Sequence, residues 1–392
     1  MKRELSLYLH IPFCIRKCKY CDFLSAPADA ETKDRYVRRL IREIEDKAEV
    51  AGDYEVISVF FGGGTPTTLP AEDLAGILDT IKRIFTPKGG SWEKAEITTE
   101  CNPATYGKTE FEVLKKAGFN RLSIGLQSCD NEELKLLGRI HTYEDFLRCY
   151  EAARTAGFDN INIDLMGGLP GQSAETWQRN LETVTALKPE HISAYSLIIE
   201  EGTPFYDLYG EEDEYRAKTG ESRGNLPDEE TERLMYRRTK EILRSAGYER
   251  YEISNYAKPG RESRHNLVYW SGGAYLGLSL GAASYMDQVR FKNGDDLKEY
   301  LDSEVIPISE KMELSKQDRM EEFMFLGLRK MKGVSGKEFY DRFDLRMEEV
   351  YGSVLKQYEE EGLMEREDDL WRLTEKGIDV SNPVLAGFLL SS

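Results

Sequence analysis

The feature that most constrains the fold is a regular alternation of strand-like and helical patterns between residues 5 and 197. Helical segments such as Ala71–Phe85 carry an apolar stripe on one face. This alternation predicts parallel βαβ units. Six units are too few for a closed eight-stranded barrel, so we predict an α/β fold with a partial, open TIM-like barrel. The predicted strands are Leu5–Ile11, Val56–Phe61, Ala95–Glu100, Arg121–Gln127, Ile161–Leu165 and His191–Leu197.

Residues suited to chemistry lie where these predicted strands end. A cysteine-bearing loop follows the first strand, and a run of glycines at 62–64 follows the second. Glu100, Gln127 and Asp164 lie at or near the ends of three others. Parallel α/β proteins build their active sites at the carboxyl ends of the strands. We therefore predict one site along this edge of the sheet.

The cysteine loop contains Cys14, Cys18 and Cys21 in a C-x3-C-x2-C spacing. Soft thiolate ligands suit an iron–sulfur cluster, and three of them would leave one iron of a [4Fe–4S] cube free for an outside molecule. A zinc site usually adds a second Cys or His pair, and here only His10 lies nearby. A disulfide is the other alternative. The spacing favours a cluster.

The residues around this loop resemble those of radical SAM enzymes, and more narrowly the oxygen-independent coproporphyrinogen III oxidase family. The resemblance rests on Tyr8-x-His10-Ile11-Pro12-Phe13-Cys14 and on Tyr20-Cys21-Asp22-Phe23. Within that family it is strongest to the HemW-type haem chaperones. The oxidases typically have a fourth cysteine where this chain has Phe23, and a longer segment before the first strand. The resemblance extends over nearly the whole chain.

The same resemblance implies a set of contacts to S-adenosylmethionine (SAM). Gly62-Gly63-Gly64-Thr65 could be a plain turn, and it lacks the lysine of a phosphate-binding loop. Beside the cysteine loop it is similar to the family's motif for the amino and carboxylate ends of SAM. The implied contacts of the first SAM are Tyr8, Tyr20, Gly63, Gly64, Thr65 and Glu100. Those of a second SAM, whose use is left open, are Gln127, Arg139, Asp164 and Ile198. As alternatives, Glu100 and Asp164 could cap helices and Arg139 could be a surface residue.

A second motif, His265-Asn266-x-x-Tyr269-Trp270, contains one of only four histidines. A histidine among aromatic residues is more often structural than a ligand. Histidine is nevertheless a common axial ligand of haem iron, and aromatic rings suit a porphyrin face. The segment resembles a motif of the HemW-type chaperones that is associated with haem. The resemblance implies a haem site outside the barrel, with His265 as iron ligand and Tyr269 and Trp270 beside the porphyrin.

Composition limits the partners. A net charge of −18, from 71 acidic and 53 basic residues, argues against a nucleic-acid binder. No apolar run approaches a membrane span, and no signal peptide is evident at the start, so we expect a cytoplasmic protein with reduced cysteines. Peripheral membrane contact and a homodimer are left open. Cys101, Cys129 and Cys149 receive no role.

The chain is expected to have three parts. Residues 1–200 form the partial barrel with the cluster and SAM site. Residues 201–308 contain a mobile acidic insertion (202–230), a helix (228–246), a strand-like run (251–256) and the histidine motif, and complete the core. Residues 309–392 have two helices followed by a hairpin, which predicts a winged-helix-like tail. Because this tail is acidic, we expect it to pack or contact a partner rather than bind DNA.

The resemblance implies a haem chaperone that binds haem and passes it to an acceptor protein of unknown identity, with the cluster and SAM controlling transfer. It leaves open whether SAM is cleaved. The alternative is an enzyme that decarboxylates coproporphyrinogen III to protoporphyrinogen IX. A radical SAM methylase or cyclopropanase of the same family is a third possibility.

Overall fold

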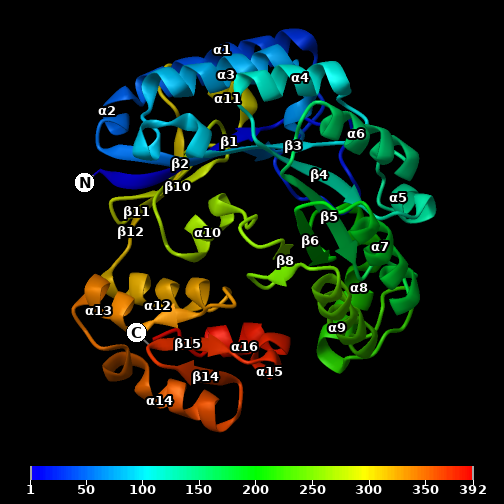
Figure 1. The fold of residues 1–392 in the computed structure, drawn as a ribbon, viewed down its shortest axis with the longest axis vertical. Coiled ribbons are helices and arrows are strands. Elements are labelled where there is room, and N and C mark those ends of the chain that lie inside the picture. The colour runs from blue at the N-terminus through cyan, green and yellow to red at the C-terminus, as the bar shows by residue number, and fades with distance from the viewer. Residues whose placement is uncertain (1, 391–392) are drawn as a thin grey trace.

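The computed structural model describes residues 2–390, and its main body is built on one twelve-stranded sheet (Figure 1). The strand order is β12-β11-β10-β9-β1-β2-β3-β4-β5-β6-β8-β7. From β9 to β6 neighbouring strands are parallel, whereas both edges of the sheet are antiparallel. The strands are β1 (Arg3–Ile11), β2 (Tyr54–Gly63), β3 (Glu96–Cys101), β4 (Arg121–Gln127), β5 (Ile161–Gly167), β6 (His191–Ser196), β7 (Glu249–Arg250), β8 (Asn255–Ala257), β9 (Tyr275–Leu278), β10 (Ala283–Met286), β11 (Val289–Asn293) and β12 (Ile308–Glu313).

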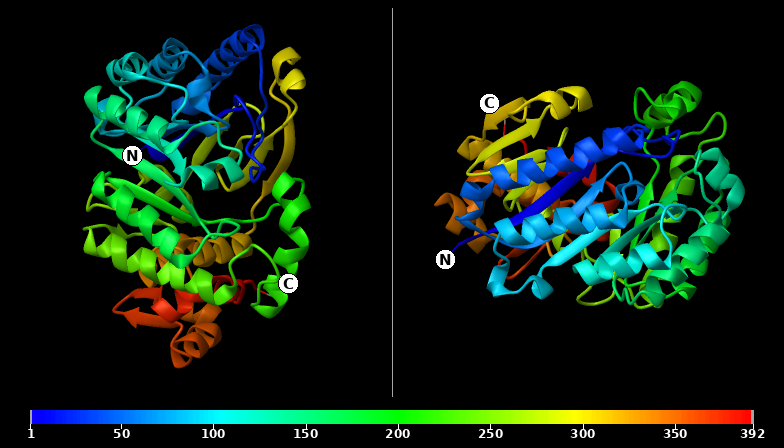
Figure 2. Two further views of the ribbon diagram at one scale, coloured as in Figure 1. Left: turned by 90° about the vertical axis from the view of Figure 1, so that its right-hand side faces the viewer. Right: turned by 90° about the horizontal axis from the view of Figure 1, so that it is seen from above.

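Helices cover the outer face of this curved, open sheet, as Figure 2 shows from two further sides. One short helix, α10, instead lies within the concave face and contacts β2 (Figure 1). Three single-turn 3-10 helices lie at Pro66–Thr68, Lys88–Gly90 and Trp92–Lys94. The α-helices of this body are α1 (Ala30–Asp46), α2 (Ala48–Ala51), α3 (Ala71–Ile84), α4 (Lys108–Ala117), α5 (Asn131–Leu136), α6 (Tyr143–Thr155), α7 (Ala174–Ala186), α8 (Pro204–Thr219), α9 (Glu229–Ser245), α10 (Arg264–Trp270) and α11 (Leu297–Asp302).

The two faces of the sheet differ in polarity because side chains alternate along each strand. On β1, Leu7 and Leu9 are fully buried in the core shared with the outer helices. Ser6 is also buried, but it faces the concave side, where its hydroxyl lies 2.6 Å from that of Ser58 on β2. The apolar outer face holds the helices in place, and the concave face is left with polar groups that can serve a site.

The predicted open barrel of six βα units is confirmed. The antiparallel strands at both edges were missed, because none exceeds six residues and the hairpins carry no long alternating pattern. The strand-like run 251–256 is mostly a turn between the short strands β7 and β8.

No helix was predicted within the acidic segment 202–230, whose mobility stays a prediction. Most of this segment is helix α8, which Thr203 caps at its N-terminus and Gly220 ends with a left-handed conformation. The sequence shows no clear apolar stripe here, because few side chains of α8 are buried and many are acidic.

The tail domain has a core of its own, separate from that of the barrel. A three-stranded sheet in the order β13-β15-β14 packs with the helices. β12 still belongs to the large sheet, so the boundary lies a few residues after the predicted 309. None of the helices within residues 2–390 is long and apolar enough to cross a membrane. The elements of the tail are α12 (Lys316–Gly327), β13 (Val334–Ser335), α13 (Gly336–Phe343), α14 (Met347–Glu360), β14 (Met364–Glu367), β15 (Leu370–Leu373), α15 (Glu375–Asp379) and α16 (Ser381–Ala386).

Candidate functional site

The cysteine loop leaves the carboxyl end of β1 and is fixed to two other parts of the barrel, the segment 137–139 and the start of α8. The Lys19 N–H donates to the carbonyl of Leu137 at 3.0 Å, and the Phe205 N–H at the start of α8 donates to the Lys19 carbonyl at 3.0 Å. The Arg16 guanidinium donates to the carbonyls of Gly138 and Arg139, each at 2.9 Å. The loop is therefore held in a defined shape rather than left free.

The three cysteines of this loop are free and partly exposed. Cys14 Sγ lies 3.5 Å from Thr65 Oγ1, which joins the loop to the glycine turn after β2. The Arg139 guanidinium donates to Cys18 Sγ at 3.6 Å and to the Gly125 carbonyl at 2.7 Å. Iron binds cysteine as the thiolate, and the positive guanidinium of Arg139 lies beside one of the three sulfurs.

This donor set fits a [4Fe–4S] cluster held by Cys14, Cys18 and Cys21. Within residues 2–390 no three Cys, His, Asp or Glu side chains converge on one metal position. A cubane cluster does not require such convergence, because each cysteine binds a different iron atom. Hydrogen bonding around cluster sulfurs tunes the potential of such centres, and Arg139 is placed to do so.

The glycine turn follows β2 and lies directly against the start of the cysteine loop. The Gly64 N–H donates to the Ile11 carbonyl at 2.8 Å, and the Thr65 N–H donates to the Phe13 carbonyl at 2.7 Å. Gly63 has a φ of +107°. A Cβ at Gly63 would lie 2.6 Å from His10 Nδ1. Glycine is therefore required both by the conformation and by the close approach of the histidine ring.

Glu100, the penultimate residue of β3, lies beside this turn and is the first acidic group of the site. Removal from water and the nearby charge of Asp164 raise its pKa, a hydrogen bond from the Gly63 N–H and the charge of Arg121 oppose the shift, and the net pKa is about 8. At neutral pH the side chain is therefore mainly protonated. A carboxyl of this kind is suited to accept a positively charged ligand, since ionisation then offsets the burial of charge.

Asp164 on β5 is the second acidic group and is embedded in a polar network. It accepts hydrogen bonds from Ser123 Oγ at 3.2 Å and from Asn162 Nδ2 at 2.7 Å. Burial raises its pKa, although these bonds partly oppose the rise. Neither Glu100 nor Asp164 caps a helix among the residues that the structure describes, because the helix N-caps are other residues.

The residues implied for a second SAM lie at or near neighbouring strand ends, but they differ in burial and in backbone conformation. Gln127 ends β4 with a φ of +72°, a strained conformation for a non-glycine residue of the kind found at functional sites. Arg139 lies between the cysteine loop and β4, and its guanidinium donates to the Tyr20 hydroxyl oxygen. Ile198 is 68% exposed after β6. Arg139 is half-buried, and its guanidinium is held by Cys18 and Gly125 rather than free on the surface. Binding of a second SAM stays a prediction.

The placement of His265 outside the barrel is wrong. Its ring is 1% exposed and lies inside the concave face, stacked on Phe60 of β2 with 5.0 Å between ring centroids. Its Nδ1 is 2.9 Å from Ser58 Oγ, and its Nε2 is 2.9 Å from Tyr269 Oη. Burial lowers the pKa of the imidazole to about 3, so it is neutral. Iron ligation by His265 stays a prediction, and it would require one of these two bonds to break.

The two aromatic residues of the motif also make internal contacts. The Tyr269 ring packs edge-on against Tyr275, with centroids 4.7 Å apart. The Trp270 ring faces the tail domain, where the Arg329 guanidinium lies 4.5 Å from the ring centroid. The motif therefore joins α10 to the barrel and to the tail. The opposite face of α10 is the one that borders a cavity.

Sequence reasoning missed two residues that support the site. His10 backs the glycine turn, and its Nε2 lies 2.8 Å from the Leu24 carbonyl, which fixes the far end of the cysteine loop. Arg121 is 2% exposed and supplies the central positive charge opposite Glu100 and Asp164. Arg121 and Ser123 lie on the same, polar face of β4, and this alternation in the sequence could have identified Arg121.

Comparisons with known proteins agree with this geometry. The Radical SAM superfamily model matches residues 8–184, and the HemN C-terminal domain model matches residues 314–380. The chain is 37% identical to heme chaperone HemW of Bacillus subtilis, over 98% of this chain and 99% of that protein. It is 34% identical to heme chaperone HemW of Escherichia coli, over 98% of each.

Among solved structures, the radical SAM enzyme coproporphyrinogen III oxidase (HemN) from Escherichia coli superposes with a TM-score of 0.83. The superposition covers 99% of this chain and 90% of that chain at 23% identity, which is a likeness of fold alone. The relatives above 30% identity match both domains from end to end, and the chain therefore belongs to the family of the heme chaperone HemW within the radical SAM superfamily.

Proposed function

We propose that this protein is a haem chaperone, which binds haem and passes it to acceptor proteins. The observation that carries the proposal is the similarity to proteins named heme chaperone HemW over 98% of the chain. Because that similarity spans the barrel and the tail alike, the proposal concerns the whole chain. The acceptor proteins and cytoplasmic location are part of the proposal.

Radical SAM proteins hold a [4Fe–4S] cluster and SAM, and this chain has residues for both. Cys14, Cys18 and Cys21 would hold the cluster, and the turn at 63–65 with Glu100 would hold SAM. When bound, the cluster supplies the electron that cleaves SAM in this superfamily. Thr65 and Arg139, which contact Cys14 and Cys18, would orient these ligands, and the concave face of the barrel would surround the cluster and SAM.

Decarboxylation of coproporphyrinogen III is disfavoured by one residue. Phe23 stands where the oxidases have a fourth cysteine, and its side chain is 59% exposed near the cluster position. An exposed phenyl ring offers no thiol at this position. It offers apolar surface for contact with a ligand or a partner. Self-association and contact with a membrane surface stay predictions.

Haem transfer provides the test of this proposal. Purified protein is loaded with one equivalent of haem, separated from free haem, and mixed with an excess of a haem-free cytochrome. We expect a stable Soret band on the loaded protein and its shift to that of the cytochrome on mixing, at a rate that rises with acceptor concentration. A rate that is independent of acceptor concentration and equals that of spontaneous haem loss would contradict a chaperone.

A further inference from the structure

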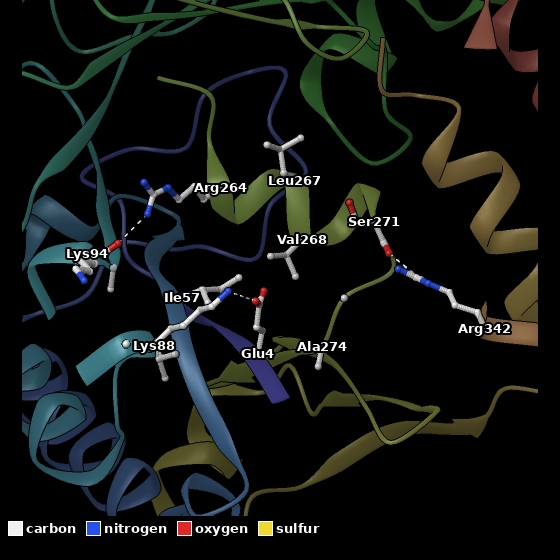
Figure 3. A pocket seen from close by; sticks show the side chains of 14 residues that line it. Glu4, Ile57, Lys88, Lys94, Arg264, Leu267, Val268, Ser271, Ala274 and Arg342 are labelled. Carbon is white, nitrogen blue, oxygen red and sulfur yellow. Dashed lines mark hydrogen bonds and ion pairs between the residues drawn. The ribbon is translucent and has the colours of Figure 1, made fainter. Parts of the chain in front are cut away.

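A cavity of about 690 Å³ opens at the amino ends of the strands, whereas the cysteine loop follows the carboxyl end of β1. Figure 3 shows the side chains that line this cavity. It is bordered by the first residues of β1 and β2, by the segments before β3 and β9, and by α10. Its volume lies within the roughly 300–1,000 Å³ typical of small-molecule sites. Nothing in the radical SAM chemistry described above uses this end of the barrel.

The rim of the cavity is positively charged. Lys88, Lys94, Arg264 and Arg342 line it together with one carboxylate, Glu4. The lining therefore has a formal charge of +3, whereas the whole chain has −18. A local reversal of charge of this kind attracts an anionic ligand to one place on an otherwise repelling surface.

The cations are held in position by the surrounding chain. Arg264 donates to the Lys94 carbonyl at 2.7 Å, and Arg342 donates to the Ser271 carbonyl at 3.0 Å (Figure 3). Arg342 also forms an ion pair with Glu338 on its own helix. Lys88 pairs with Glu4. Within residues 2–390 the Lys94 ammonium forms no ion pair, so it is free to bind a ligand anion.

The interior of the cavity is apolar. α10 presents Leu267 and Val268 to it, and Val56, Ile57 and Ala274 complete the surface. Arg264, Leu267, Val268 and Ser271 follow helical spacing, so one face of α10 borders the cavity while His265 and Tyr269 face the barrel. The lining includes no histidine, cysteine, methionine or tyrosine, the usual axial ligands of haem iron.

We propose that this cavity is a porphyrin seat, in which the cationic rim binds the propionate carboxylates and the apolar interior contacts the macrocycle. This inference rests on the proposed haem function and adds a place and a mode of binding to it. Recognition at this seat is independent of iron, because the lining offers no axial ligand. Such binding suits transfer, since no bond to the iron has to break when an acceptor takes the haem.

The test compares haem and metal-free protoporphyrin IX on the reconstituted full chain. The double variant Lys88→Gln and Lys94→Glu lowers the charge of the lining from +3 to zero. The matched control, Lys108→Gln and Lys356→Glu, makes the same change at exposed positions on α4 and α14. Unfolding curves and cluster absorbance confirm that each variant is folded. Binding is followed by Soret absorbance and by porphyrin fluorescence.

We expect wild type and control to bind both porphyrins with similar affinity, and the cavity variant to bind each about tenfold more weakly or worse. The dimethyl ester of protoporphyrin IX should also bind weakly to wild type. If haem binds and the cavity variant has unchanged affinity, the seat is elsewhere and the proposed function stands. Binding of haem without metal-free porphyrin would also overturn this inference alone. Absence of binding for every porphyrin would overturn the proposed function with it.

Discussion

The protonation state of Glu100 should control how strongly this protein binds SAM. Its pKa is about 8, so at pH 7 roughly one molecule in ten carries the ionised carboxylate. SAM carries a positive sulfonium, and the ionised form is the one that a cation favours. Binding should therefore be accompanied by proton release from Glu100 at any pH below about 8.

The size of the effect follows from the same pKa. Each pH unit below it costs about 1.4 kcal/mol for ionising the carboxyl, so affinity should fall about tenfold per unit. Half of the carboxyls are ionised at pH 8 and about one in a hundred at pH 6, so the loss between them is about 2.3 kcal/mol, or roughly fiftyfold. Affinity should rise with pH up to about 8, the pKa of Glu100, and then level off.

Isothermal titration of SAM into the anaerobically reconstituted protein measures this dependence, in buffers of different ionisation enthalpy to count protons. Glu100→Gln is the control, because the amine of SAM titrates equally in both proteins and only the wild type has the carboxyl. The wild-type profile should be steeper than that of the variant between pH 6 and pH 8. Parallel profiles with equal proton release would refute the role given to Glu100.

Three further predictions concern the cluster, the histidine motif and Phe23. Alanine at any of the three loop cysteines should abolish the iron–sulfur absorbance, whereas Cys101→Ala should leave it intact. His265→Ala removes hydrogen bonds to Ser58 and Tyr269 and leaves a buried cavity, so urea unfolding should show a loss of about 3 kcal/mol; an unchanged stability with an altered haem Soret band would make it an iron ligand instead. Phe23→Cys alone should produce no protoporphyrinogen, and its appearance in chromatographic assays would show that this position decides the activity.

The central part of the fold could be predicted because its strands are long and its helices strongly amphipathic. Arg121–Gln127 was predicted to the residue, since its apolar alternation is uninterrupted. The site along the strand ends followed from the same reasoning, because parallel strands bring Glu100 and Asp164 to one edge whatever their loops do. These features depend on local pattern and on sheet topology alone.

The position of His265 and the cavity behind α10 could not be predicted, because both depend on contacts between distant parts of the chain. The position of His265 follows from the carboxylate of Glu96 on β3, which accepts hydrogen bonds from the N–H groups of Arg264 and His265 at 3.0 and 3.1 Å. That carboxylate lies far away in the sequence, so no local pattern reveals that α10 is drawn into the barrel. The cavity behind α10 was missed for the same reason, since its lining comes from five separate segments and the tail.

The most direct test of the account offers the reconstituted protein two porphyrin compounds under identical anaerobic conditions with SAM and a reductant. One sample receives haem and the other receives coproporphyrinogen III, and both are followed by absorbance and by chromatography of the porphyrins. The account predicts that haem is bound at one equivalent and that coproporphyrinogen III remains unconverted. Protoporphyrinogen IX formed over many turnovers, with no retained haem, would contradict it.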